Sequence, residues 1–288
     1  MFSLKTIIED ARARKAAVGH FNISDLAFLK AIAEAARELN APAIIGVSEG
    51  ERDFLDVHEA AALVKDLREN HGQPIFINAD HTHSFAKAKE AVDAGYDAVL
   101  FDGSRLPMEE NISQTIKVFE YAKSKNPDIL IEGELGYIGS SSKILKEIPE
   151  GAAVKPEDLT KPEEAAEFAR RTGINLLAPA VGNIHGMLAD IPNPRLNIDR
   201  VKEIGEAVGI PLVLHGGSGI VDSDFLAAID AGIAVIHIST ELRVAWRKGI
   251  EVGLRENPEE ITPYKILPAA VDEIKRVVYN RLKLFNGD

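Results

Sequence analysis

The 288-residue chain contains no cysteine, only one tryptophan and three methionines. The absence of cysteine excludes disulfide bonds, thiolate metal sites and cysteine nucleophiles, and it fits a reducing compartment. Apolar runs of the roughly 20 residues that span a bilayer are also absent, and the opening MFSLKTIIEDARARK lacks the apolar core of a signal peptide. We therefore expect a cytoplasmic protein that does not act at a membrane.

Basic residues are in the minority, with 33 Lys and Arg against 45 Asp and Glu and a net charge of −12. This balance argues against nucleic acid or an anionic membrane surface as a partner. An anionic ligand must therefore be held by local groups. Hydrophobic residues make up 45% of the chain, which excludes a disordered protein and provides for a large core.

Short β-prone apolar runs alternate with helical stretches along the whole chain, with no Pro/Gly/Ser-rich linker between halves. Eight such units match the size of an α/β fold of the (β/α)₈ TIM-barrel type, here one domain over residues 1–288 with a C-terminal helical appendage at 264–286. A doubly wound open sheet is the alternative, because the number of strands does not show closure. The eight runs are residues 17–22, 43–48, 74–81, 97–103, 128–134, 174–182, 210–217 and 233–240.

Two kinds of connection can be distinguished between these runs. Ordinary helices are expected at 24–40, with Ser24 as its cap and Leu26 and Leu29 on its apolar face, and after the last run at 240–257 and 269–285. Residues 135–161 and 183–197 are too long and too rich in Gly, Ser and Pro for ordinary connections. We expect both to be functional loops over the strand ends, the first of them mobile.

Every predicted strand places a polar side chain at or near its carboxyl end, the end that carries the active site in TIM barrels. Five of the eight histidines lie at or just beyond such ends, whereas a random distribution would scatter them over helices and loops. These polar residues are Asn22, Ser48, Asp80, His81, His83, Asp102, Glu132, Glu134, His185, His215 and His237.

Three of the histidines suggest a metal site. His81, His185 and His215 follow three different runs, and three imidazoles with one open position are the ligand set of catalytic zinc. Asp102, Glu132 and Glu134 have three open interpretations: carboxylates that orient the histidines, ligands of a second cation, or polar residues at the barrel rim.

Asp80 precedes His81 directly and would point away from it if the strand pleat continued to that point. The two residues need not share a role. A cap for the helix that begins near Ser84 is the alternative for Asp80.

Two further segments suggest a phosphate site. LHGGSG at 214–219 and HIST at 237–240 each precede a helix, after the seventh and eighth runs, where barrels frequently bind phosphate. Backbone N–H groups with the hydroxyls of Ser218, Ser239 and Thr240 would form the cradle. Such oriented dipoles allow an acidic protein to hold phosphate without a basic patch.

The segments FNISDL, VSEG, NADHTHS, FDGS, EGELG, LAPAVGNIHG, LVLHGGSG and TELR, in this order, resemble the motifs of class II (zinc-dependent) fructose- and tagatose-bisphosphate aldolases. The resemblance implies cleavage of a ketose 1,6-bisphosphate to dihydroxyacetone phosphate and glyceraldehyde 3-phosphate, in a homo-oligomer (dimer or tetramer). It implies zinc ligation by His81, His185 and His215 and general acid/base catalysis by Asp80. It also implies a second divalent or monovalent cation at Asp102 and Glu134.

The resemblance likewise implies a set of substrate-binding residues. Ser48 and Arg243 match positions that meet the other half of the substrate, and we add Asn22 and His237 from their places at strand ends. The positions that match the dihydroxyacetone-phosphate site are Gly186, Gly216, Gly217, Ser218, Ser239 and Thr240.

Two positions depart from the family pattern. Ser142 stands where the family has a mobile-loop glutamate implicated in proton transfer, and Glu147 or Glu150 of the same loop are candidate substitutes. His237 stands where the family has asparagine. We predict that its imidazole contacts the dihydroxyacetone-phosphate half; a buried structural histidine is the alternative.

The residues leave the substrate open. Fructose and tagatose bisphosphates differ only in configuration at C4, and Thr240 and Arg243 favour different members of that pair. A different phosphosugar is the main enzymatic alternative because of Ser142 and His237. A metal- and phosphosugar-binding protein with little catalysis is the alternative from another functional class.

Overall fold

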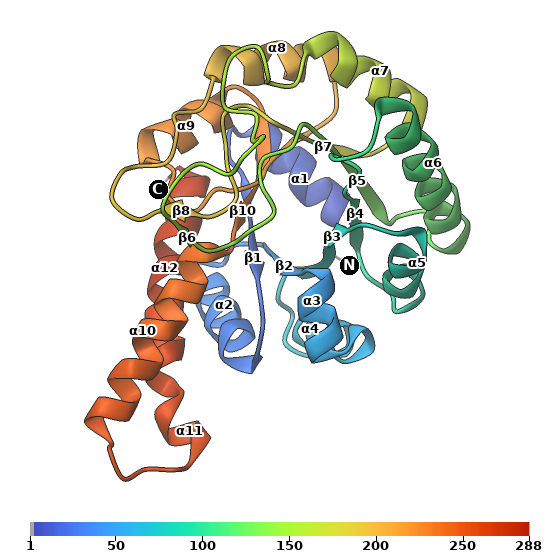
Figure 1. The fold of residues 1–288 in the computed structure, drawn as a ribbon. Coiled ribbons are helices and arrows are strands. Elements are labelled where there is room, and N and C mark those ends of the chain that lie inside the picture. Colours follow the sequence, from blue (N-terminus) through green and yellow to red (C-terminus); the bar gives the residue numbers. More distant parts are fainter. Residues whose placement is uncertain (1–2, 288) are drawn as a thin grey trace.

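The eight predicted β-runs form a closed parallel barrel in the computed structural model, which describes residues 3–287 (Figure 1). The strand order around the barrel is β1-β10-β9-β7-β5-β4-β3-β2. Direct pairing of β1 with β10 closes the sheet, so the open-sheet alternative is wrong and the (β/α)₈ barrel is confirmed. The barrel strands are β1 Val18–Asn22, β2 Ala43–Val47, β3 Ile75–Thr82, β4 Ala98–Phe101, β5 Leu130–Leu135, β7 Leu176–Pro179, β9 Leu212–Leu214 and β10 Ile233–Ile238.

Helices surround the barrel and bury their apolar faces against the strands (Figure 1). Large side chains such as Phe101, Phe168 and Phe225 are fully buried in this layer. Because helices cover the outside and side chains fill the inside, the strands are apolar on both faces. The helices that connect successive strands are α2 Leu26–Leu39, α3 Glu49–Leu55, α4 Val57–Glu69, α5 Phe85–Asp93, α6 Met108–Lys125, α7 Pro162–Thr172, α8 Ile198–Val208 and α9 Asp222–Asp230.

The N-terminal cap of helix α2 lies one residue later than predicted. The carboxylate of Asp25 accepts the backbone N–H groups of Ala27 and Phe28 at 2.8 and 3.2 Å, so Asp25 is the cap. Ser24 instead donates its hydroxyl to Glu51 at 3.3 Å. Leu26 is 62% exposed and lies outside the buried face, because the apolar stripe begins at Ala27.

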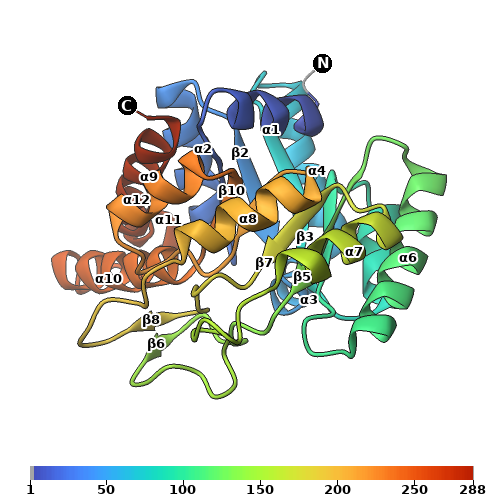
Figure 2. The same ribbon diagram turned by 90° about the horizontal axis from the view of Figure 1, so that it is seen from above.

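A helix that the sequence reading missed closes the amino-terminal end of the barrel. In α1, Leu4–Ala13, the side chains of Leu4, Ile8 and Ala11 join a core cluster with barrel residues such as Val18 and Phe76. Figure 2 shows α1 at the end opposite to the long loops. The strand ends that carry the polar residues are therefore left as the accessible end.

The C-terminal segment packs on the barrel wall. Helix α12, Pro268–Asn286, lies against α2, β1 and α10 (Thr240–Glu256) and buries Ile274, Val278 and Phe285. It therefore closes the ring of helices instead of standing apart as an appendage. The outer part of α10 and the short helix α11, Pro263–Ile266, project beyond the barrel (Figure 1); we call residues 251–267 the arm.

The two long loops meet over the carboxyl ends of the strands. Their short strands β6 (Ile144–Leu145) and β8 (Met187–Leu188) pair in parallel and lie side by side at that end of the barrel (Figure 2). The loops thus form one covering layer.

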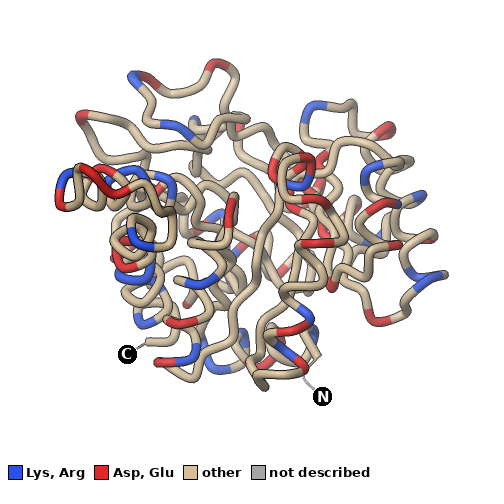
Figure 3. Tube along the Cα trace, turned by 90° about the horizontal axis from the view of Figure 1, so that it is seen from below, with Lys and Arg blue, Asp and Glu red and all other residues tan. Residues whose placement is uncertain are grey.

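Charged side chains of both signs are distributed over the helices. Figure 3 shows Lys and Arg interspersed with Asp and Glu along the helices. Within residues 3–287, no helix is both long enough and apolar enough to cross a membrane.

Candidate active site

A small cavity lies where the carboxyl ends of the barrel strands meet the covering loops. Its volume is about 30 Å³, which is room for one or two water molecules. Apart from Ser142, the lining residues are all sequence-predicted site residues. The lining consists of Asn22, Asp80, His81, Ser142, His185, Gly186, His215, Gly216, Gly217, Ser218, His237, Ser239 and Thr240.

The end of β3 departs from a regular strand at Asp80 and His81. The pairing register with β4 shifts between Ala79 and Thr82, and His81 has a φ of +37°. This break in the pleat lets two consecutive side chains line the same cavity. Helix α5 is capped by Ser84, whose hydroxyl accepts the N–H of Lys87 at 3.2 Å, so the capping alternative for Asp80 is wrong.

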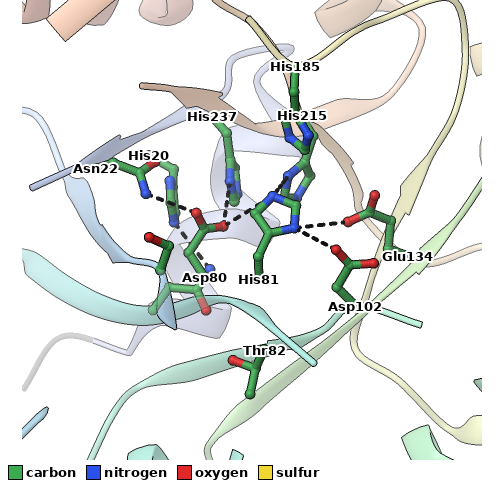
Figure 4. Close-up of polar contacts among 12 residues, drawn as sticks. His20, Asn22, Asp80, His81, Thr82, Asp102, Glu134, His185, His215 and His237 are labelled. Carbon is green, nitrogen blue, oxygen red and sulfur yellow. Dashed lines mark hydrogen bonds and ion pairs between the residues drawn. The ribbon is translucent and has the colours of Figure 1, made fainter. Parts of the chain in front are cut away.

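His81, His185 and His215 converge from three different segments (Figure 4). One ring nitrogen of each lies within 4.8 Å of the others. The rings are steeply inclined to one another, with interplanar angles of 76–80° and centroid separations of 4.7–5.9 Å. Such mutually inclined rings direct their nitrogens toward one point.

The second nitrogen of each of these histidines faces an oxygen acceptor and therefore carries the hydrogen. The nitrogens left with lone pairs are Nε2 of His81, Nε2 of His185 and Nδ1 of His215, and the first and last of these are 3.1 Å apart. Two ring nitrogens at this distance share either a proton or a cation, and three such imidazoles are a donor set that fits a divalent metal ion. The orienting contacts are His81 Nδ1 to Asp102 Oδ2 at 2.9 Å, His185 Nδ1 to the Gly139 carbonyl at 2.7 Å and His215 Nε2 to Glu132 Oε1 at 2.8 Å.

The three carboxylates of the site serve unequal roles. Asp102 and Glu132 contact His81 and His215, and these contacts support the interpretation that they orient the histidines. Glu134 is buried with Oε2 3.5 Å from Nδ1 of His81. Burial, together with the neighbouring charge of Asp102, raises the pKa of Glu134 to about 8.

Asp80 is buried between Asn22 and His237 (Figure 4). Its Oδ2 accepts the amide of Asn22 at 2.9 Å, and its Oδ1 lies 3.3 Å from Nδ1 of His237. Burial alone would raise the pKa of Asp80, but the neighbouring imidazoles of His81 and His237 outweigh burial and hold that pKa well below its usual value. Asp80 is therefore a carboxylate that can accept a proton.

His237 is held in a stack of imidazoles. His20, a residue that the sequence reading did not assign to the site, lies parallel to it with ring centroids 3.4 Å apart, and the ring of His215 lies on it at 3.9 Å. Nε2 of His237 is buried and has no hydrogen-bond partner among residues 3–287. The ring of His237 is therefore fixed by packing. Its Nε2 has no partner among the described residues, and His237 lines the cavity.

The two predicted phosphate-binding segments lie together, but their serine hydroxyls differ in their hydrogen-bond partners. Ser218 Oγ accepts the N–H groups of Ser239 and Glu241 at 3.3 and 3.1 Å and so holds the start of α10. Ser239 Oγ is buried and unpartnered within the described chain. Gly216 has a φ of +61°, and a Cβ there would lie 2.2 Å from the Ile184 carbonyl, so only glycine permits this close approach.

Ser48 and Arg243 both contact Glu51. Ser48 forms a capping box at the start of α3, in which its hydroxyl donates to Glu51 at 2.8 Å. Arg243 donates to the same carboxylate at 2.8 Å. Glu51 was missed by the sequence reading, although the spacing Ser-x-x-Glu was a visible signal for the capping box.

A basic groove of about 340 Å³ adjoins the cavity and shares Ser142 and Thr240 with it. Lys143, Arg243, Arg247 and Lys248 line this groove. Glu251 also lines the groove.

The loop position that departs from the family pattern is at the cavity. Ser142 lines it, and its carbonyl accepts Nη1 of Arg243 at 3.3 Å. Glu147 and Glu150 are exposed in the same loop, and the cavity wall formed by residues 3–287 does not include them.

Comparison with known proteins defines the class to which this barrel and its histidine cluster belong. The model of the family described as fructose-bisphosphate aldolase class-II matches residues 2–288. The chain belongs to this family, and it is an aldolase, a carbon–carbon lyase of the metal-dependent class.

Individual relatives cover the whole chain. The fructose-bisphosphate aldolase of Staphylococcus aureus strain Mu50 is 39% identical over 290 residues, covering 99% of this chain and 97% of the relative. The fructose-bisphosphate aldolase of Geobacillus stearothermophilus is 36% identical, covering 100% and 97%. Among solved structures, the YdjI aldolase from Escherichia coli K12 superposes with a TM-score of 0.79 at 29% identity, covering 99% of this chain and 96% of that one.

Proposed function

We propose that the protein catalyses the reversible aldol cleavage of a ketose 1,6-bisphosphate, with fructose 1,6-bisphosphate as substrate, to dihydroxyacetone phosphate and glyceraldehyde 3-phosphate. The observation that carries the proposal is the convergence of three metal-facing histidine nitrogens beside a buried, ionised Asp80. The relatives named fructose-bisphosphate aldolase in Staphylococcus aureus and Geobacillus stearothermophilus support the choice of substrate.

The proposed resident metal is one Zn²⁺, held by Nε2 of His81, Nε2 of His185 and Nδ1 of His215. Three neutral histidines without a thiolate are the donor set of catalytic zinc. When bound, the ion supplies Lewis-acid polarisation of the substrate ketone. A second divalent or monovalent cation at Asp102 and Glu134 remains a proposal, supported by the approach of both carboxylates to His81.

Asp80 is the proposed general acid/base. It takes the proton of the C4 hydroxyl during cleavage and returns it during condensation. Oδ1, the oxygen without a hydrogen-bond partner among the described residues, is the atom suited to this task, since Oδ2 is occupied by Asn22. A positioned acid/base contributes about 10²–10⁴-fold to rate.

The dihydroxyacetone-phosphate half is assigned to the cavity side that carries Gly186, Gly216, Gly217, Ser218, Ser239 and Thr240. His237 joins this set through its unused Nε2. Nδ1 of His237 faces the Asp80 carboxylate at 3.3 Å. With the hydrogen on that nitrogen, Nε2 carries a lone pair and accepts a substrate hydroxyl. The far phosphate is assigned to the basic groove at Arg243, to which Ser48 is linked through Glu51.

The test is a cleavage assay on fructose and tagatose 1,6-bisphosphates, with and without a chelator. We expect cleavage of the fructose substrate, loss of activity with the chelator, and recovery with Zn²⁺ at one ion per chain by elemental analysis. Full activity in metal-free protein would contradict the metal assignment. Binding of phosphosugar without turnover would favour a binding protein.

A different phosphosugar is the second candidate, and Ser142 in the cavity wall is the observation that favours it. A serine cannot supply the proton transfer assigned to a glutamate. Condensation of dihydroxyacetone phosphate with aldehydes of different length and charge tests this alternative. The alternative is supported if another aldehyde reacts faster than glyceraldehyde 3-phosphate.

We also propose that the protein forms a homo-oligomer whose subunits contact one another through the arm. Three large side chains of the arm, Leu254, Ile261 and Tyr264, are 50%, 90% and 73% exposed. A single domain over 1–288 and a cytoplasmic location remain predictions.

A further inference from the structure

We propose that Glu51 is a positioning residue for Asp80 and acts through Asn22, an inference that rests on the proposed acid/base role of Asp80. The observation behind it is a chain of short polar contacts that leads from the rim of the barrel to the acid/base. None of its members needs to touch the metal or the substrate for the chain to work.

The central member of the chain is the amide of Asn22. Its Nδ2 donates to Oδ2 of Asp80 at 2.9 Å and to Oε2 of Glu51 at 3.0 Å. Both amide hydrogens are therefore used, one on each carboxylate. Because two acceptors fix the amide plane, Asn22 can place Asp80 only while Glu51 holds it.

Glu51 is itself held at several points. Its Oε2 accepts the backbone N–H and the hydroxyl of Ser48, each at 2.8 Å. Its Oε1 accepts Ser24 at 3.3 Å and Arg243 at 2.8 Å. The side chain is buried, so its orientation is set by these donors and not by water.

The hydrogen bond from Asn22 to Oδ2 holds the Asp80 carboxylate in its orientation. The other oxygen, Oδ1, has no hydrogen-bond partner among residues 3–287, with His237 Nδ1 nearby at 3.3 Å. Loss of the Asn22 contact would free the carboxylate to rotate. Proton transfer requires the reacting oxygen at hydrogen-bond distance from the substrate hydroxyl, so rotation lowers kcat more than it changes substrate binding.

The two oxygens of Glu51 allow the hydrogen-bond relay to be separated from the ion pair with Arg243. In Glu51→Gln, the amide oxygen can take the Oε2 place, which three donors surround, and the amide nitrogen then faces Arg243. This variant keeps the contact to Asn22 and loses the ion pair. Glu51→Met has nearly the same volume and loses both.

We expect Glu51→Met to lower kcat for fructose 1,6-bisphosphate by at least about 10-fold with KM changed by less than about 3-fold. Glu51→Gln should keep kcat within about 3-fold of the parent. Glu59→Met, the same substitution at an exposed glutamate of α4, is the matched control and should cleave at the parent rate. In an Asn22→Ala background, Glu51→Met should cause no further loss, because the relay is already broken.

Crystal structures supply a readout that does not depend on turnover. The Asp80 carboxylate should be rotated or in two conformers in Glu51→Met and unchanged in Glu51→Gln. Melting temperature and bound zinc are measured alongside, since a purely structural Glu51 would change the melting temperature and leave kcat of the folded enzyme intact. Should Glu51→Met not fold, Glu51→Asp withdraws the oxygen from Asn22 and should show the same loss of kcat.

Three outcomes overturn the inference: unchanged kcat in Glu51→Met, equal losses in Glu51→Met and Glu51→Gln, or an undiminished further loss in the Asn22→Ala background. If the parent enzyme itself cleaves no bisphosphate, the proposed function fails, and the orientation of Asp80 in the crystal structures still decides the role of Glu51.

Discussion

At the scale of single residues, the site depends on an unusual backbone conformation. His81 has a φ of +37°, in the left-handed region that non-glycine residues seldom adopt. Its ring is tied to Asp102 at 2.9 Å, which helps to hold this conformation. Strain of this kind costs on the order of 1–3 kcal/mol and is maintained where the surroundings determine it strongly. Here it directs both Asp80 and His81 into one cavity.

Asp80→Asn should retain zinc and lose about 10²–10⁴-fold in kcat, because the amide fits the same space but accepts no proton. The check is kcat for fructose 1,6-bisphosphate together with zinc content by elemental analysis. Asp10→Asn, an exposed carboxylate on α1 at the far end of the barrel, is the control and should have no effect. A near-normal kcat, or loss of zinc, would show that Asp80 has another role.

His20 should make the stability of the protein depend on pH. Burial lowers the pKa of His20 from 6.5 to about 4, so between these values the unfolded chain binds a proton that the folded chain does not. Its contribution to stability is complete above pH 6.5 and is lost as pH falls toward 4, with a total of up to about 3 kcal/mol.

The variant His20→Asn should therefore lose less unfolding free energy than the parent between pH 7 and pH 4.5. Urea unfolding of the metal-free proteins at both pH values measures this difference. The same substitution at the exposed His58 is the control. Identical pH dependence in parent and His20→Asn would mean that His20 is not kept neutral by burial.

At the scale of elements, the covering loops form part of the cavity wall through Ser142 and Gly186. A space of about 30 Å³ cannot hold a sugar bisphosphate, and Ser142 forms part of its wall. The loops are joined to each other by the β6–β8 pair, in which two residues of each strand are paired. Because the β6–β8 pair joins them, the two loops can move away from the strand ends together.

Amide hydrogen exchange should therefore slow in residues 139–150 when dihydroxyacetone phosphate and Zn²⁺ are added. The ligand would fill the space under the loop and favour its closed form, whereas helix α7 should exchange at the same rate in both states. The measurement is exchange followed by mass spectrometry. Equal exchange of 139–150 with and without ligand would argue against a moving loop.

At the scale of the whole molecule, the arm is the part least explained by the fold of one chain. Its outer residues project from the barrel (Figure 1), and Ile261 is 90% exposed at its tip. Burying a side chain of this size is worth about 1.5–3 kcal/mol. A second copy that covers the arm would recover this free energy.

The double variant Ile261→Asp with Tyr264→Asp should therefore shift the protein toward monomers, as measured by light scattering coupled to size-exclusion chromatography. Both side chains are exposed in the single chain, so its fold should remain stable. Phe54→Asp, which changes a 77% exposed aromatic residue outside the arm, is the control. An unchanged oligomer in the double variant, or a monomeric parent protein, would contradict an interface through the arm.

The sequence by itself determined the eight strands, the helices between them, and the polar residues at the strand ends. These features are local, since apolar runs, helical periodicity and helix starts can be recognised within a few residues. The motif order added the family, and it agreed with the three histidines predicted as metal ligands from their places at the strand ends. Local pattern misplaced the cap of α2, because Ser24 and Asp25 are both good caps and the choice depends on Glu51, far along the chain.

Only the tertiary structure decided which polar groups meet. Closure of the barrel, the broken pleat at Asp80 and His81, and the sealing of its base by α1 require contacts between distant segments. The His20–His237 stack brings together β1 and β10, the first and last strands of the barrel. Glu51 likewise joins Asn22 to Arg243. Such contacts depend on strand register and barrel closure, which short-range sequence pattern does not encode.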